Sequence, residues 1–321
     1  MQKKLNGMDL PHRYIIVSIE SNADLPLCII PLTDDYKFAS VLPISIDCPN
    51  KIFPSVRGMW FQDGYLYFGT ECNNSKLFKC QLVYSENKQC FEAINVKCII
   101  DIAHDIHDVM VINQQGDITT LLIVSTGNDQ ILRIKTDFNA ILSKEIVCAT
   151  GKNNDTVHYN TILKHKSQLW FTMHGLKNSS NVTYCNSDNN KQLLFTDVNI
   201  MENSHSYTLL YNSKEEIEGY IVNLSKQQSI MYIGLDNEWI VNIGGWTRGC
   251  AIINNYTDGP KMFCVGASHT RDNQTGIQKP ILFMFKNQEG PKIIDRIELD
   301  KDNSKASIFS VRYIEYDFRI S

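Results

Sequence analysis

Apolar residues in this chain occur in short runs that alternate or continue over five to eight positions and are rich in Ile, Val, Tyr, Phe and Thr. Examples are "HDVMVIN" (107–113), "TTLLIVST" (119–126), "QILRIKT" (130–136) and "KEIVCAT" (144–150). Such runs are typical of β-strands. Turn-forming clusters such as "QQGD" and "TGND" separate them, and amphipathic helical patterns are absent. The pattern predicts an all-β protein.

The strands repeat as a unit of strand, turn, strand, loop, strand, in most cases followed by a weaker fourth strand. The first strands of successive units begin at Arg57, His107, His158, His205 and Arg248. These intervals of roughly 45 to 50 residues match a four-stranded β-propeller blade. The repeat therefore predicts a β-propeller over residues 1–321 as one domain.

Five complete units leave both ends of the chain unassigned. "SIFSVRYIEYDF" (307–318) reads as a first strand, whereas "RYIIVSIE" (13–20), "LCIIPLT" (27–33) and "KFASVLPI" (37–44) read as second, third and fourth strands. Pairing the two ends completes a sixth blade and removes two open sheet edges. We therefore expect six blades, the last closed by the N- and C-terminal strands.

The second strands carry a resemblance to known propellers. "SQLWFTMHG" (167–175) and "DGYLYFGTE" (63–71) resemble those of the gluconolactonase, strictosidine synthase and virginiamycin lyase propellers, and of a propeller group known only as a domain of unknown function. The likeness covers the whole chain at the level of the repeat. Gluconolactonase-like enzymes hold calcium with a Glu, Asn and Asp set, which does not map onto the blade starts here. The resemblance implies the fold and carries over no site residue.

In a propeller the first strand of each blade lines the central channel, so equivalent positions form a ring. Here the ring comprises Arg57, His107, His158, His205 and Arg248, with Phe309 as a sixth member. Gly58 and Gly249 would let other groups approach the backbone closely. A structural channel needs no such set of cationic and imidazole side chains, which makes the ring the candidate site.

Two chemistries fit the ring. His107, His158 and His205 could hold a divalent metal such as Zn, Mn or Fe, or act as catalytic acids and bases. Alternatively, Arg57 and Arg248 could bind a carboxylate, phosphate or sulfate through paired hydrogen bonds. The adjacent Asp105 and Asp108 could orient imidazoles, but turn capping is the favoured interpretation.

Further candidates border the ring. Tyr207 and Trp246 adjoin ring positions and could stack on a sugar or aromatic ligand, although propellers also bury aromatic residues between blades. His174 and His269 each end a second strand and are expected at loops on one face. The polar insertion "SHTRDNQTG" (268–276) has the character of a lid.

Composition narrows the functional classes. The net charge of −4 and pI near 6.1 give no basic excess, so a nucleic-acid or membrane partner is not expected. No signal-peptide-like or transmembrane apolar segment is found, and the ten cysteines are scattered without zinc-type spacing. These features predict a cytoplasmic protein with reduced thiols.

Two functions remain open. The first is a lyase or hydrolase that acts at the ring on an anionic or sugar-like small molecule, with or without a divalent metal. The second is a non-catalytic propeller that binds a ligand or a protein partner, because the fold alone decides neither.

Overall fold

A computed structural model describes most of the chain. The described residues are 4–5, 8–9, 12–20, 25–47, 55–71, 74–149, 155–166, 168–176, 179–185, 191–193, 204–234, 237–269, 277, 279–299 and 306–320. They contain one 3-10 turn, η1 (Thr126–Asn128), and no α-helix. No helix among them has the length and apolar character needed to cross a membrane.

Four antiparallel sheets have four strands each, ordered as in the chain. Their strands are β10 (Ile106–Gln115), β11 (Ile118–Ser125), β12 (Gln130–Thr136) and β13 (Ile141–Ala149); β14 (Tyr159–His165), β15 (Gln168–Leu176), β16 (Ser179–Cys185) and β17 (Lys191–Leu193); β18 (Ser204–Tyr211), β19 (Ile217–Leu224), β20 (Ser229–Gly234) and β21 (Glu238–Asn242); and β22 (Trp246–Ile252), β23 (Lys261–Ser268), β24 (Ile281–Asn287) and β25 (Pro291–Glu298).

A fifth sheet has eight strands in the order β26-β3-β4-β5-β9-β8-β7-β6. They are β26 (Ser307–Glu315), β3 (Arg13–Glu20), β4 (Leu27–Pro31), β5 (Leu42–Ile46), β9 (Cys90–Ala103), β8 (Ser75–Ser85), β7 (Tyr65–Thr70) and β6 (Val56–Gln62). It consists of two antiparallel four-stranded halves joined through the parallel pair β5–β9. A separate short hairpin is formed by β1 (Lys4–Leu5) and β2 (Met8–Asp9).

The two ends of the chain meet in one of these halves. β26 pairs antiparallel with β3, in a register that runs from Ser307 opposite Glu20 to Glu315 opposite Arg13. The predicted pairing of the C-terminal strand with the N-terminal segment is confirmed.

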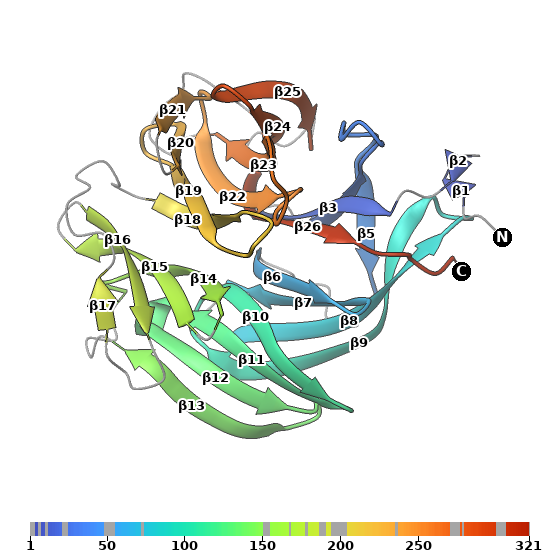
Figure 1. Cartoon of the computed structure of the whole chain (residues 1–321). Helices are drawn as coiled ribbons and strands as arrows, with labels where there is room; N and C mark the ends of the chain where they lie inside the picture. Colours follow the sequence, from blue (N-terminus) through green and yellow to red (C-terminus); the bar gives the residue numbers. More distant parts are fainter. Residues whose placement is uncertain are drawn as a thin grey trace.

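The sheets surround a common centre (Figure 1). Strands β6, β10, β14, β18, β22 and β26 each contact the next one, and β26 contacts β6, so these strands form a closed ring around the axis. The chain is therefore all-β with the sheet arrangement of a β-propeller. The innermost strands position the candidate site.

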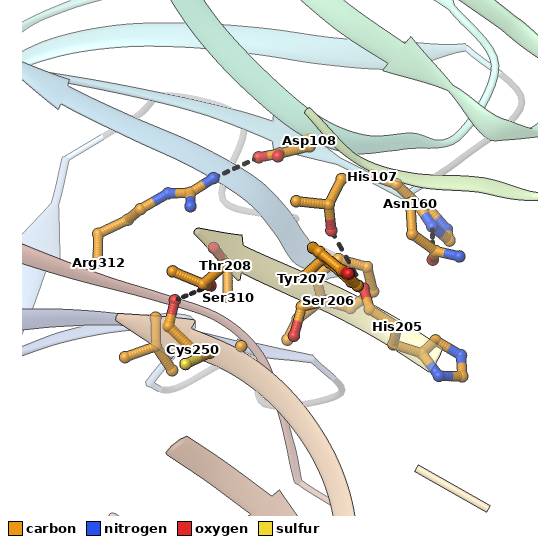
Figure 2. Close-up of a pocket in the computed structure, with 14 residues that line it drawn as sticks. His107, Asp108, Asn160, His205, Ser206, Tyr207, Thr208, Cys250, Ser310 and Arg312 are labelled. Atoms are coloured by element: carbon orange, nitrogen blue, oxygen red, sulfur yellow. Dashed lines mark hydrogen bonds and ion pairs between the residues drawn. The ribbon is translucent and has the colours of Figure 1, made fainter. Parts of the chain in front are cut away.

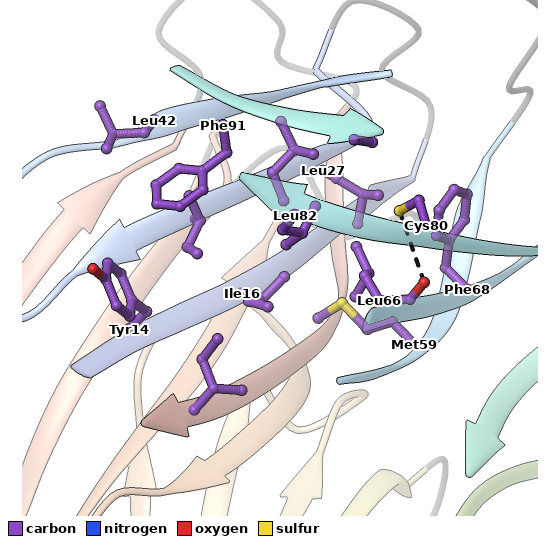
Figure 3. Close-up of a cluster of buried hydrophobic side chains, with 14 of the residues drawn as sticks. Tyr14, Ile16, Leu27, Leu42, Met59, Leu66, Phe68, Cys80, Leu82 and Phe91 are labelled. Carbon is purple, nitrogen blue, oxygen red and sulfur yellow. Dashed lines mark hydrogen bonds between the residues drawn. The ribbon is translucent and has the colours of Figure 1, made fainter. Parts of the chain in front are cut away.

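Apolar side chains fill the spaces between neighbouring sheets. The cluster drawn in Figure 3 lies between the two halves of the eight-stranded sheet and includes Tyr14, Met59 and Phe91. Phe318, just beyond β26, is fully buried there, with its ring 5.0 Å from Tyr14 and 4.8 Å from Phe91 between centroids. Burial of these rings fastens the C-terminal segment to both halves.

Candidate functional site

Each innermost strand carries an irregularity in its pairing with the second strand at the same point. The register shifts fall between Val56 and Met59, Ile106 and Asp108, Tyr159 and Ile162, Ser204 and Tyr207, Arg248 and Cys250, and Ile308 and Ser310. Such bulges bend a strand and re-aim its side chains. Five of these bulges contain a ring residue, namely Arg57, His107, Asn160, His205 and Phe309. In β22 the unpaired residue is Gly249, and the ring residue Arg248 directly precedes it.

The predicted ring is therefore correct at five positions and wrong at the one assigned to His158. Asn160, not His158, occupies the bulge of β14, because His158 precedes the strand in a left-handed conformation with φ of 51°. His158 nevertheless reaches the ring from outside the strand. Its imidazole centroid lies 4.9 Å from that of His107 and 6.4 Å from that of His205.

The two ring glycines allow close approach of backbone, as predicted. A Cβ on Gly58 would lie 2.3 Å from the Cα of Asp108 in the neighbouring strand β10. Gly249 has φ of 67°, and a Cβ there would lie 2.8 Å from the backbone nitrogen of Val311 in β26. Side chains at these positions would push adjacent inner strands apart.

The two ring arginines are buried and engaged with carboxylates of the chain itself. Arg57 pairs with Glu20 at 2.8 Å, with both oxygens of Asp105 at 2.9 Å, and with Glu71. Glu20 uses its other oxygen to bind Arg248 at 2.9 Å, so one buried carboxylate bridges both guanidinium groups. Binding of an anion by the arginines, which stays a prediction, would have to displace these carboxylates.

Phe309 is the ring position that both arginines contact. The guanidinium carbons of Arg57 and Arg248 lie 5.2 and 4.6 Å from its ring centroid, and His107 contacts it edge-on at 5.1 Å. Cation–π contact with the face of an aromatic ring stabilises guanidinium groups that have left water. The sixth ring position therefore supports the buried charges.

His107 is held neutral by its surroundings. The amide nitrogen of Asn160 donates to the His158 carbonyl at 3.0 Å, so its oxygen faces His107 Nδ1 at 3.0 Å and that nitrogen carries the proton. Nε2 then accepts from the Arg57 guanidinium. Burial, reinforced by the Arg57 charge and opposed by Asp105, lowers the pKa of His107 to about 4.

Asp105 is part of this charge cluster, so turn capping is not its main role. Its Oδ2 also lies 3.0 Å from His107 Nε2. Burial alone would raise the pKa of Asp105, but its neighbours His107 and Arg57 lower it to about 2. Asp108 instead accepts from the amides of Val109 and Ile162 and pairs with Arg312 at 2.7 Å.

His158 differs from the other two histidines in its exposure. Its side chain is 21% exposed, and its Nδ1 lies 2.6 Å from the Asp155 carboxylate, which is 49% exposed. His107 and His205 are 2% and 8% exposed. His205 Nδ1 is bonded to the Ser225 hydroxyl at 2.8 Å. His158 is thus the ring-contacting histidine at the solvent side.

The predicted metal centre finds no matching donor set. Among the described residues, no group of three His, Cys, Asp or Glu side chains is arranged to hold a metal ion. His107 in particular turns Nε2 toward a guanidinium cation, which would repel a metal at that nitrogen. The three histidines meet as rings in edge-on contact instead of converging through their nitrogens.

The remaining predicted residues are dispersed. Trp246 contacts the ring, with its centroid 5.3 Å from that of His205. Tyr207 is 1% exposed and packs on Tyr220 in a core cluster, so its ring is not placed to stack on a ligand. His269 directly follows β23, at the end of a second strand as predicted. His174 lies in β15, but its side chain and most of segment 268–276 lie outside the described part.

Sequence reasoning missed four residues of the cluster: Glu20, Glu71, Asp155 and Asn160. Glu20 ends β3, Glu71 directly follows β7, and Asp155 lies in the connection before β14. A sequence signal was available only for Asn160, because aligning "NTI" (160–162) with "RGM" (57–59), "HDV" (107–109) and "RGC" (248–250) would have placed it in the ring.

A small polar pocket lies against the ring, and His107, Asn160, His205 and Phe309 of the ring line it. Figure 2 shows the Asp108–Arg312 ion pair at one side and Asn160 and His205 at the other. The space that a water-sized sphere can reach is about 20 Å³. This suffices for ordered water and not for a sugar, so a larger ligand would have to bind at the mouth.

Comparison with known proteins places the fold. The sequence matches no family model and no curated protein. A protein from Lactobacillus plantarum has a similar structure with a TM-score of 0.53 at 10% identity, over 94% of this chain and 99% of that chain. A provisionally assigned 6-phosphogluconolactonase from Bacteroides fragilis gives a TM-score of 0.49 at 10% identity, over 94% and 98% of the two chains. At 10% identity, the similarity to the Lactobacillus plantarum protein shows a shared fold alone.

Proposed function

We propose that the protein is a hydrolase or lyase that acts on a small molecule at the mouth of the channel, with His158 as its general acid and base. The observation that carries the proposal is the Asp155–His158 pair, 2.6 Å between carboxylate and imidazole, at the exposed edge of the ring. An imidazole oriented by a carboxylate is a common arrangement for a catalytic acid and base.

The chemistry follows from the tautomer of His158. An ionised carboxylate only accepts hydrogen bonds, so the Nδ1 that faces Asp155 carries the proton. Nε2 is then the basic nitrogen, which would take a proton from water or from the substrate and return it to the leaving group. The Asp155 charge would stabilise the imidazolium ion formed in that step.

The charge of the mouth favours a neutral, hydroxyl-rich substrate over an anion. Arg57 and Arg248 are each 5% exposed and bound to carboxylates, whereas Glu71 and Asp155 are 41% and 49% exposed. Carboxylates would repel an anion but accept hydrogen bonds from sugar hydroxyls. Trp246, beside His205, could stack on the apolar face of a sugar ring.

We also propose that the propeller has six blades. Each half of the eight-stranded sheet would be one blade, with β26 innermost in one and β6 innermost in the other. The closed ring of contacts among the innermost strands and the bulge that each of them carries support this count.

The test is hydrolysis of D-glucono-δ-lactone, a neutral sugar lactone, followed by acid release in a pH-stat. The substitution His158→Asn keeps a residue type that tolerates a left-handed backbone and removes the basic nitrogen. Its rate constant should fall by about 10²- to 10⁴-fold, the usual contribution of general acid–base catalysis. His165→Asn, in a histidine that stacks on Tyr211 outside the ring, is the matched control and should retain the rate.

Absence of turnover above the spontaneous rate, or full activity of His158→Asn, would contradict the catalytic proposal for this substrate class. A non-catalytic propeller is then favoured, and one observation supports it: Glu20 bridges both buried arginines of the ring, and the pocket beside the ring has room for water but not for a sugar. Binding of the lactone without turnover would identify that case.

A further inference from the structure

Asp129 lies outside the ring and organises the segment that carries His158. It is fully buried at the end of η1, in the connection between β11 and β12. One carboxylate oxygen accepts the amide and hydroxyl of Thr156 at 2.8 and 3.0 Å. The other accepts the amides of Val157 and His158, both at 3.0 Å.

These four bonds hold a segment whose backbone is otherwise unfavourable. Asp155 and His158 have φ values of 54° and 51°, in the left-handed region. Such conformations cost free energy for residues other than glycine and persist where surrounding contacts fix them. Three successive amides converge on Asp129, and this convergence places the Asp155 and His158 side chains within hydrogen-bond distance of each other.

The same connection also fixes the segment relative to the charge cluster. The Thr126 amide donates to the carbonyl of Asp105 at 3.0 Å, and the Thr126 hydroxyl donates to the carbonyl of Tyr159 at 2.6 Å. Residues 126–129, in the β11–β12 connection, therefore bond to the backbone of Asp105, of residues 156–158 and of Tyr159. These bonds fix the Asp155–His158 pair relative to Asp105.

We propose that Asp129 is a positioning residue that pre-organises the Asp155–His158 pair at the channel mouth. The inference deepens the proposed function and rests on it for its catalytic meaning. Asp129 acts through the backbone of residues 156–158 and does not touch the channel mouth. Without its carboxylate, the amides lose their common acceptor and the segment relaxes away from the left-handed conformation.

The measurement is the tautomer of His158, read from the ¹⁵N chemical shifts of its two ring nitrogens at a pH where the imidazole is neutral. The groups that face this imidazole are Asp155 from its own segment, Asp105 and His107 from the neighbouring sheet, and His205 from β18. In the native protein Nδ1 should carry the proton, because it donates to Asp155.

Two variants and a control decide the matter. Asp155→Gly removes the acceptor, tolerates the left-handed backbone and should abolish the preference for the Nδ1–H tautomer directly. Asp129→Asn should abolish it although Asp155 is intact. Asp137→Asn is the matched control, because Asp137 also accepts two backbone amides, those of Asn139 and Ala140 at 2.8 Å, in the β12–β13 connection. It should leave the tautomer unchanged.

An unchanged tautomer in folded Asp129→Asn would overturn the inference, since a merely structural role for Asp129 would lower the melting temperature alone. An unchanged tautomer in Asp155→Gly would overturn it as well. If Asp129→Asn does not fold, Thr156→Ala removes one of the four bonds and should still shift part of the population; no shift would overturn the inference. With lactone turnover as a separate assay, Asp129→Asn should lower kcat about 100-fold. Loss of the tautomer preference in a protein without turnover would retain the positioning role and reject the proposed function.

Discussion

The buried, neutral His107 should make the stability of the protein depend on pH between 6.5 and about 4. An unfolded chain binds a proton on this imidazole below pH 6.5, whereas the folded protein does so only below about pH 4. Between these values protons favour the unfolded state, so the free energy of unfolding falls as the pH falls. The contribution is complete above pH 6.5 and lost below about pH 4.

The magnitude follows from the difference between 6.5 and about 4. At about 1.4 kcal/mol per pH unit, this difference corresponds to about 3 kcal/mol. His107 is 2% exposed, so solvent screening does not reduce the value. Asp105, whose pKa falls from 3.8 to about 2, loses its stabilising contribution only below about pH 4 and does not overlap with this window.

The assay is urea unfolding followed by tryptophan fluorescence at closely spaced pH values from 7 to 4, with the native protein and His107→Asn. Asn can donate to Asn160 in place of Nδ1 but does not titrate. The variant is expected to be less stable at pH 7 and to lack about 3 kcal/mol of the pH-dependent change. His165→Asn should keep the native slope. If His107→Asn loses as much stability as the native protein between pH 6.5 and 4, the description of His107 as a buried neutral imidazole is wrong.

Two further predictions concern the frame of the site. Gly58→Ala places a Cβ 2.3 Å from the Asp108 Cα and should lower the free energy of unfolding by about 3 kcal/mol. The control Gly116→Ala, in an open turn, should lower it by about 1 kcal/mol. Equal losses in denaturant titration would contradict the close approach of the strands. Phe318→Ala removes a fully buried ring between the two halves of the eight-stranded sheet and should cost about 3 to 5 kcal/mol, and a melting temperature equal to that of the native protein would show that the C-terminal segment does not fasten them.

Local patterns were sufficient to predict the strands and the closure of the chain ends. Alternation of apolar residues depends on neighbours in sequence, so the runs near His107 and the pairing of β26 with β3 could be read directly. The ring was predictable for the same reason, because a repeat places equivalent residues around one axis. The error at His158 arose because a long-range contact, the Asp129 carboxylate, holds that residue outside its strand.

The carboxylates of the site could not be predicted in this way. Glu20 is separated in the sequence by 37 positions from Arg57 and by 228 positions from Arg248. No periodicity in the sequence indicates that these residues are partners. The charge of the site therefore differs from the expectation based on its basic residues alone. Two arginines in a sequence suggest anion binding, but the buried acids that neutralise them appear only when the sheets are assembled.

The parallel pair β5–β9 has a consequence for how the closed chain recovers from opening. Ile44 to Ile46 pair with Phe91 to Ala93 at the outer rim, so β3 to β5 stay tethered to the adjacent half even when β26 detaches from β3. The residues after β26 reach that same half, where the Tyr84 amide donates to the Arg319 carbonyl. A returning C-terminal strand thus meets a template that is already in place, and re-closure becomes a short local search instead of an encounter between two loose chain ends.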